Sequence, residues 1–527
     1  MSRATVNVII VAACGLLSRV LGIGREMLMA HAAGVTAEKN AYDLAFMIPD
    51  ILNHVVSTGF LAIIFIPIFQ GFRTREDDDG AWHFLSNTLT VLGSVLLLLM
   101  IPTMIWMREL LSLFTAAASL TPDILDRATY LSRIILPGQF FIFVGSYFMA
   151  LQNCREQYLI PAMTGAVYNV AIIVGGLIGL HTGLEGFAWG VPAGGFVGFL
   201  VLQVIGARRE GIKYRPVFKP FDPMLRHYLA LMVPLSIGLG SQFGMELVMR
   251  ALGGIFGASS ISSLNYAYKV MFTVVSVFGY SVGVTGYPRM SLLVKQGRFQ
   301  EVNRDVWRSL SRMFVLLTAA VVAVWVLSFP IVRILFERGA FTREDTELVT
   351  TLLRWYLPAT LGLSMQVVLV RAFYAHERMW MPTIINSGVF LLTIPAYFLL
   401  AERAGVLCVP IVGAAGVLTQ IAVMSIAWAR RHGREGMRLA LQNIGRAVAV
   451  LLFMVAVARF IETFTAQWVR QAGLATLIVY AGAAGLVLMS ASLVLQSALG
   501  SNDAADIIAM FAGKISRKLR ILKRDKG

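Results

Sequence analysis

Charged side chains interrupt the first apolar stretch of the chain, where a membrane helix would cross the bilayer. Arg19 is followed by Arg25 and Glu26, and Gly22 lies between the two arginines. Arg19 and Glu26 are seven positions apart, so they share one face of a helix. A charge at the centre of a membrane helix costs about 2.5–3.5 kcal/mol and normally faces a cavity or a partner. We therefore expect this helix to present its charged residues to a cavity.

Polar and charged residues also occur in the second, seventh and eighth apolar stretches, and we expect them to line the same cavity with a basic bias. They are Asn40, Asp43, Asp50, Asn53 and His54; Glu246 and Arg250; and Lys269. Guanidinium groups bind phosphate oxygens through paired hydrogen bonds, and lysine adds a point charge. A diphosphate head group therefore fits this set of residues.

Structural explanations of the same residues remain open at this point. Arg19 and Arg25 could pair with Glu26 or extend towards an interface, and Glu246 and Arg250 could pair at i,i+4 spacing. His54 has no second histidine or cysteine near it in the sequence, so we expect no metal site and no cofactor. The three cysteines are far apart and lack a ligand or disulfide spacing.

The composition indicates a membrane protein. Of the 527 residues 57% are hydrophobic and only 14% are charged, whereas soluble domains carry about 25% charged residues. Continuous apolar runs of about 20 residues favour helices that cross a bilayer. We predict an all-α polytopic membrane protein with about fourteen transmembrane helices, at 5–33, 40–71, 84–107, 128–152, 157–180, 187–207, 227–250, 261–290, 309–335, 347–375, 380–401, 405–429, 440–462 and 472–498.

Basic residues gather in alternate loops between these spans. The loop that follows the sixth span, for example, contains Arg208, Arg209 and Lys213, and the opposite loops are poorer in lysine and arginine. By the positive-inside rule both termini are cytoplasmic. The net charge of +16 is therefore a matter of topology, and we expect no nucleic-acid partner. The basic tail at 499–527 either lies on the inner membrane surface or is disordered.

An internal repeat is visible as a set of matches at one constant offset. Leu136-Pro137 corresponds to Leu357-Pro358, Arg133 to Arg354, and Pro161 to Pro382. The copies are six spans apart, so they have the same orientation, as in transporters with parallel repeats. We predict a lobe at 1–226, a lobe at 227–438, and two appended helices at 439–498. Transporters of this kind bind their cargo between the lobes.

With these residues in place, the chain resembles the MurJ (MviN) lipid II flippases of the multidrug/oligosaccharidyl-lipid/polysaccharide exporter superfamily. The most specific stretches are Ser18-Arg19-Val20-Leu21-Gly22 with Arg25-Glu26, Phe65-Ile66-Pro67, and Leu335-Phe336-Glu337-Arg338-Gly339-Ala340-Phe341-Thr342. The resemblance implies that a lipid-linked diphosphate sugar binds Arg19, Arg25, Glu26 and Lys269. From the residues of the second span we expect Asp43 and Asn53 to line the same cavity. It also implies a groove for the polyprenyl tail at 439–498.

Some positions depart from that family's pattern. An arginine is usual at Asn53 and at Lys269, and an acidic residue is frequent at Phe272. These departures leave the identity of the saccharide open.

The function expected from the sequence is therefore a lipid flippase and not an enzyme. It would move a polyprenyl-diphosphate-linked saccharide, lipid II, to the outer leaflet of the bacterial cytoplasmic membrane by alternating access. Its partners would be this lipid-linked oligosaccharide, membrane lipids, and a coupling ion or the membrane potential. The alternatives are an exporter of another lipid-linked oligosaccharide, of exopolysaccharide or O-antigen type, a drug/cation antiporter, and a membrane glycosyl-lipid enzyme.

Overall fold

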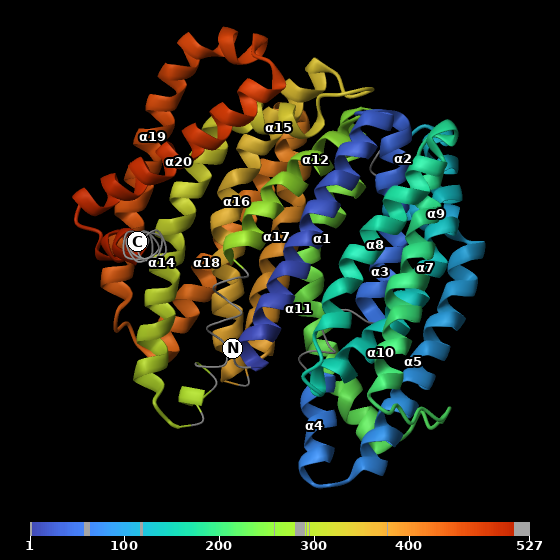
Figure 1. Cartoon of the computed structure of the whole chain (residues 1–527). Helices are drawn as coiled ribbons and strands as arrows, with labels where there is room; N and C mark the ends of the chain where they lie inside the picture. The colour runs from blue at the N-terminus through green and yellow to red at the C-terminus, as the bar shows by residue number, and fades with distance from the viewer. Residues whose placement is uncertain are drawn as a thin grey trace, which may run out of the picture. The chain divides into compact units, whose positions relative to one another are not determined.

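The computed structural model describes residues 3–56, 64–115, 120–257, 259–279, 290, 292–294, 296–376 and 378–510. Within these ranges the regular structure is helical and there is no strand, which confirms the predicted all-α class (Figure 1). The tail after residue 510, residues 57–63 of the predicted second span and residues 280–289 of the predicted eighth span lie outside the described residues.

The chain divides into two compact units. The first unit contains Met1–Asn265 and Leu335–Asp345, and the second contains Tyr266–Ile334 and Thr346–Gly527. The predicted lobe boundary at residue 226 remains a prediction. The helices of the first unit are α1 (Arg3–Ala33), α2 (Ala37–Ala45), α3 (Met47–Val56), α4 (Ile66–Thr74), α5 (Asp78–Ile105), α6 (Met107–Phe114), α7 (Pro122–Cys154), α8 (Leu159–Ile178), α9 (Glu185–Gly194), the π-helix η3 (Gly195–Val201), α10 (Leu202–Arg209) and α11 (Pro223–Gly253).

The helix α12 (Ser260–Val274) begins in the first unit and continues into the second. It is followed by the π-helix η5 (Val275–Gly279), α14 (Phe299–Val326), α15 (Ser328–Phe336), α16 (Arg343–Ala375), α17 (Trp380–Ala404), α18 (Cys408–His432), α19 (Met437–Gln471) and α20 (Leu474–Ala498).

Helices cover at least part of every predicted span. Among the described residues, nine helical segments are long and apolar enough to cross a bilayer. One of them, at 380–432, contains both α17 and α18. The chain is therefore a multi-pass helical membrane protein, and the count of fourteen spans remains a prediction.

The helix bounds repeat at the offset found in the sequence. The first and last residues of α5 correspond to those of α14 at this offset, and those of α7 correspond to those of α16. The starts of α8 and α17 correspond in the same way. Proline lies inside α7 at Pro137 and inside α16 at Pro358. The repeat is thus a property of the helices as well as of the residue types.

One packing contact is preserved in both copies with different side chains. A Cβ on Gly145 in α7 would lie 2.0 Å from the carbonyl oxygen of Phe199, so this close approach requires glycine. The corresponding residues of the second copy are Gln366 and Gln420, and their side-chain amides are hydrogen-bonded at 3.1 Å. The first copy joins its helices by close backbone approach, and the second joins them by a polar pair.

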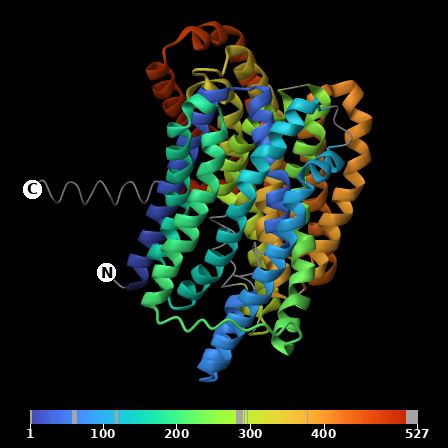
Figure 2. The ribbon, with the colours of Figure 1, turned by 90° about the vertical axis from the view of Figure 1, so that its right-hand side faces the viewer.

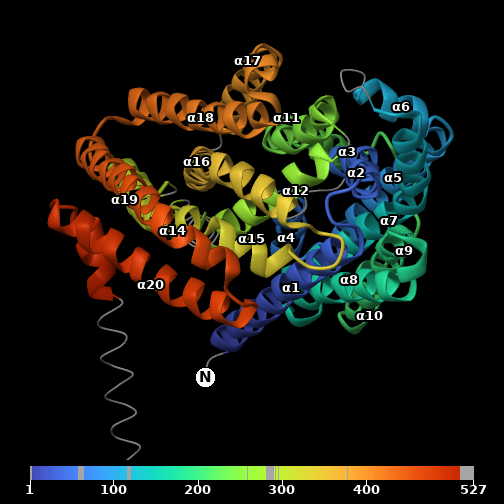
Figure 3. The ribbon, with the colours of Figure 1, turned by 90° about the horizontal axis from the view of Figure 1, so that it is seen from above.

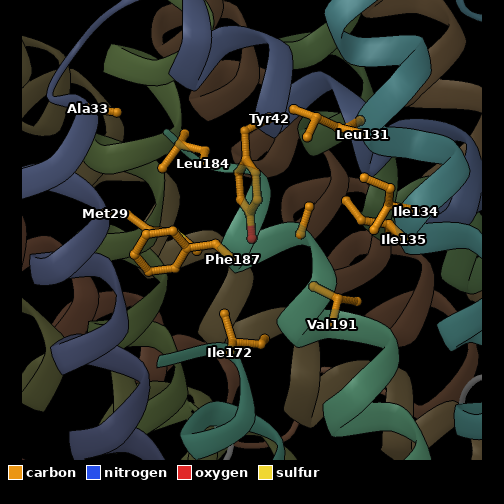
Figure 4. Close-up of a cluster of buried hydrophobic side chains, with 12 residues drawn as sticks. Met29, Ala33, Tyr42, Leu131, Ile134, Ile135, Ile172, Leu184, Phe187 and Val191 are labelled. Carbon is orange, nitrogen blue, oxygen red and sulfur yellow. The ribbon is translucent and has the colours of Figure 1, made fainter. Parts of the chain in front are cut away.

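Within the first unit, α1 lies alongside α8 (Figures 2 and 3). The Asn169 side-chain amide of α8 donates to the carbonyl oxygen of Ser18 at 3.2 Å, and Gly22 lies close to the same amide. The upper part of α1 joins a buried apolar cluster formed with α2, α7, α8 and α9, in which the Tyr42 ring lies near Phe187 and Val191 (Figure 4). These contacts fix the helix that carries Arg25.

The end of α1 packs against the turn at 337–341, which belongs to the motif shared with the resembled family. The Ala340 amide donates to the carbonyl oxygen of His31 at 3.0 Å. Gly34 and Gly339 both have positive φ, at +55° and +60°. A Cβ on Gly339 would lie 2.3 Å from the His31 carbonyl oxygen. The motif therefore has a structural role that its sequence does not reveal.

Replacing Gly339 with alanine is expected to destabilise the protein by about 1–3 kcal/mol, because the backbone is left-handed there and the added carbon collides with His31. The measurement is the melting temperature of the purified protein in detergent. Gly71→Ala is the matched control, since Gly71 is helical and a Cβ there meets nothing within 4 Å. Equal melting temperatures for the Gly339 and Gly71 variants would contradict this account.

The start of the tail is anchored to the protein. Residues 502–510 are helical, and the Asp503 carboxylate is buried. It accepts hydrogen bonds from Ser311 of α14, from the Asn443 amide of α19 at 2.8 Å and from Arg312 at 3.3 Å. Arg312 also pairs with Asp506 at 2.6 Å. This part of the predicted tail therefore packs on the second unit.

Candidate functional site

The charged residues of α1 lie close to two tyrosines. The Arg25 guanidinium contacts the Glu26 carboxylate at 2.8 Å, and the Arg25 side chain remains 23% exposed while that of Glu26 is 9% exposed. Tyr42 of α2 and Tyr168 of α8 are near enough to interact electrostatically with Arg25. Arg19, near the middle of this helix, is exposed. The predicted pairing within α1 therefore involves Arg25 and Glu26.

Asp43 takes part in a buried ion pair within α2. Its carboxylate contacts the Lys39 ammonium one helical turn earlier, and both side chains are almost completely buried. The Lys39 ammonium also lies 5.7 Å from the centre of the Tyr42 ring. Asn40, in the same turn, accepts a hydrogen bond from the Ser262 amide at 2.7 Å. These contacts hold α2 in place and leave little of Asp43 accessible to a cargo.

A third group of charges links α11 to α3. The Arg250 guanidinium contacts Glu246 at 2.6 Å and Asp50 at 3.0 Å, and the Arg250 side chain is only 6% exposed. Asp43 is also near enough to interact with Arg250. The expected i,i+4 pairing of Glu246 with Arg250 is confirmed. Asp50, which comes from a distant part of the sequence, joins that pair.

The charges of these three groups largely compensate one another. The three groups above contain three cations, Arg25, Lys39 and Arg250, and four carboxylates, Glu26, Asp43, Asp50 and Glu246. Each of these three cations contacts a carboxylate. Arg19 and Lys269 lie outside the three groups, and the basic bias expected for the cavity remains a prediction. Among the described side chains of α1, Arg19 and the partly exposed Arg25 are arginines that a polar ligand could reach.

Lys269 lies in the second unit, on α12, and its side chain is partly buried. The residue before it, Tyr268, stacks on Phe272 with ring centres 5.8 Å apart and meets the edge of Tyr356 at 5.9 Å. Asn53 is half-buried on α3 in the first unit. A cavity shared by Lys269 and the residues of α1 remains a prediction.

Two features of the site were missed in the sequence. Lys39 lies four positions before Asp43, a spacing that signals an ion pair on a helix. Tyr42 and Tyr168 carried no signal, since aromatic residues are frequent throughout the chain.

Within the part of the chain that the structure describes, no group of three histidine, cysteine, aspartate or glutamate side chains is arranged to hold a metal ion. The charged groups are distributed over α1, α2, α3 and α11 instead. A helical multi-pass protein with an internal repeat and ionisable groups on its membrane helices has the construction of a secondary transporter.

The comparisons with known proteins identify the family of transporters. A family model described as "Lipid II flippase MurJ" matches residues 29–479, and the chain belongs to this family. It is a transporter and not an enzyme. The probable lipid II flippase MurJ of Rhizobium tropici is 28% identical over 90% of both chains. The lipid II flippase MurJ of Burkholderia cenocepacia is 26% identical over 77% of this chain and 79% of its own.

Solved structures agree on the fold. A lipid II flippase MurJ in an inward closed conformation matches with a TM-score of 0.75 and 22% identity, over 95% of this chain and all of that chain. An inward-facing multidrug transporter of the MATE family matches with a TM-score of 0.65 and 12% identity, over 80% of this chain and 98% of its own. The fold is therefore shared with both kinds of transporter.

Proposed function

We propose that this chain moves lipid II, a polyprenyl-diphosphate-linked saccharide, from the inner to the outer leaflet of the bacterial cytoplasmic membrane. Membership of the lipid II flippase family supports this cargo. The observation that carries the site is the exposure of cations midway along α1, where Arg19 is exposed and Arg25 is partly exposed. A charge at membrane depth is tolerated when it faces water or a partner.

The diphosphate would bind Arg19 and Arg25 from α1 and Lys269 from α12. Guanidinium groups can donate two parallel hydrogen bonds to phosphate oxygens. Arg25 already donates to Glu26 through Nε at 3.3 Å and through Nη2 at 2.8 Å, so a phosphate would take over donors that this carboxylate uses. Glu26 then acts as the group that holds Arg25 ready between cargoes. Asn53 would contribute a polar lining, whereas Asp43, which is buried against Lys39, would not contact the cargo.

Transport would follow alternating access of the two lobes, with both termini in the cytoplasm. The lipid-linked diphosphate is an anion, and an inside-negative potential favours its outward movement by about 2.3 kcal/mol per charge per 100 mV. The membrane potential or a coupling ion would supply the driving force. The polyprenyl chain would remain in the lipid beside α19 and α20.

The test is complementation of a bacterial strain depleted of its own lipid II flippase. The parent chain is expected to restore growth, and Lys269→Gln is expected to fail because it removes a cationic contact of the diphosphate, which is worth about 1.5–3 kcal/mol. Lys269→Arg should retain function, since the family usually carries arginine there.

The matched control is Lys213→Gln, which neutralises an exposed loop lysine. Membrane abundance of each variant is measured alongside growth. Full growth with Lys269→Gln at normal abundance would remove Lys269 from the site. Failure of the abundant parent chain to restore growth would argue against lipid II as the cargo.

A further inference from the structure

The second unit contains a cavity with charged and apolar side chains in its wall, and none of its lining residues is assigned to the diphosphate of the cargo. Its volume is about 220 Å³, room for about seven water molecules at their liquid volume. The wall is formed by α14, α15, α16, α19 and α20. The cavity is therefore large enough for a small polar head group.

Two ion pairs join α16 to α19 across this cavity, with the cation on α19 in one pair and on α16 in the other. Glu347 of α16 contacts Arg470 of α19 at 3.4 Å, and Arg354 of α16 contacts Glu462 of α19 at 2.7 Å. The charged residues are seven positions apart on α16, so they lie on one face and are separated by about 10.5 Å along the helix. Each helix thus offers one cation and one carboxylate to the same space, and the four charges cancel.

Between the two ion pairs lies a buried hydroxyl that has no partner in the structure. Thr350 lines the cavity and is only 4% exposed, and its Oγ1 accepts and donates no hydrogen bond. A buried polar group without a hydrogen bond is unfavourable by about 1–3 kcal/mol. A ligand with an oxygen acceptor at this place would remove that penalty.

Aromatic side chains surround this end of the bundle. Trp325, in the cavity wall, lies under the guanidinium groups of Arg354 and Arg459 at 4.7 and 5.0 Å. Trp468, which is 48% exposed, meets the edge of Tyr480 with ring centres 5.4 Å apart. Tryptophan and tyrosine gather at the head-group level of membranes. On the orientation indicated by the loop charges, this level belongs to the outer leaflet.

We propose that this cavity binds the head group of a zwitterionic phospholipid that carries a phosphate and a primary ammonium, as phosphatidylethanolamine does. The phosphate would lie against Arg354 and accept from the Thr350 hydroxyl, and the ammonium would lie towards Glu347 or Glu462. A net anion would meet two carboxylates, and a net cation would meet two arginines. A zwitterionic head group can place its phosphate against an arginine and its ammonium against a carboxylate, so neither of its charges is opposed.

The experiment is native mass spectrometry of the full-length protein in detergent with defined phospholipids added. Phosphatidylethanolamine is expected to be retained in preference to phosphatidylglycerol, and Thr350→Val should lower its retention about tenfold. The matched control is Thr360→Val, which removes another buried and unpartnered hydroxyl of α16 away from the cavity. Equal losses in the two threonine variants, or no loss in either, would overturn the proposal.

A second variant is designed to shift the preference from phosphatidylethanolamine towards phosphatidylglycerol. Glu462→Gln leaves the cavity with a net positive charge, so it should retain phosphatidylglycerol better and phosphatidylethanolamine less well than the parent does. Equal retention of both lipids by the parent chain would refute a zwitterion site. If soluble phosphoethanolamine displaces the lipid at the same concentration, the cavity recognises the free head group, and the proposal that its ligand is a lipid is refuted. Lipid retention and transport are separate measurements, so either can fail without the other.

Discussion

Replacing Arg25 with glutamine is expected to weaken capture of the lipid-linked diphosphate by about 10- to 150-fold, the equivalent of about 1.5–3 kcal/mol for a hydrogen bond to a charged group. Glutamine keeps a polar side chain but loses the charge and the paired donors. Transport of lipid II into the outer leaflet of proteoliposomes, measured with a label that reacts only from outside, should fall accordingly. Binding of lipid II to the detergent-purified variant should fall by the same factor.

The control for Arg25 concerns its partner. Arg25→Gln removes the cation that contacts Glu26, whose side chain is only 9% exposed, so part of any loss could come from stability. The double variant Arg25→Gln/Glu26→Gln removes both charges and should melt close to the parent while remaining unable to transport. Lipid II transport at the parent's rate by this double variant would show that Arg25 does not bind the cargo.

Replacing Arg250 with leucine is expected to destabilise the protein by about 3–5 kcal/mol, since it leaves two carboxylates near each other without the cation that joins them. The Arg250 side chain is 6% exposed and contacts both Asp50 and Glu246. Thermal unfolding of the purified protein measures the change. The effect on lipid II binding by the folded fraction should be small, because this arginine is enclosed.

Neutralising Asp50 and Glu246, the carboxylate partners of Arg250, tests whether charge imbalance causes the loss of stability. In the Arg250→Leu background, adding Asp50→Asn and Glu246→Gln removes the unpaired charges, and the triple variant should recover much of the lost melting temperature. Recovery would show that charge imbalance causes the loss. If the triple variant melts as low as the single variant, the lost packing of the arginine stem is the cause.

Much of the fold follows from the sequence because long apolar runs identify membrane helices. The constant offset between matching residues identified the repeat, which reappears in the bounds of α5 with α14 and α7 with α16. Interruptions within spans were harder to predict. The second predicted span contains a break between α2 and α3 at Phe46, and the sixth contains the π-helix η3. Apolar composition does not distinguish these from a continuous helix.

The candidate site was only partly predictable. Arg19, Arg25 and Glu26 were found because charges are expensive inside an apolar run. The pairing of Arg250 with Asp50 joins two distant parts of the sequence, and no local pattern encodes it. Counting cations alone therefore does not show which of them carboxylates neutralise. Charge balance depends on which carboxylates the fold brings near each arginine, and this is tertiary information.

Glu26 of α1 and Glu246 of α11 show two ways in which a carboxylate can hold an arginine of a membrane helix. Glu26 pairs with the arginine just before it, and Glu246 pairs with the arginine one helical turn after it. On α1 the guanidinium stays partly open to solvent, and on α11 the guanidinium is enclosed by carboxylates. An open ion pair can exchange its carboxylate for a ligand, whereas an enclosed one holds two helices together.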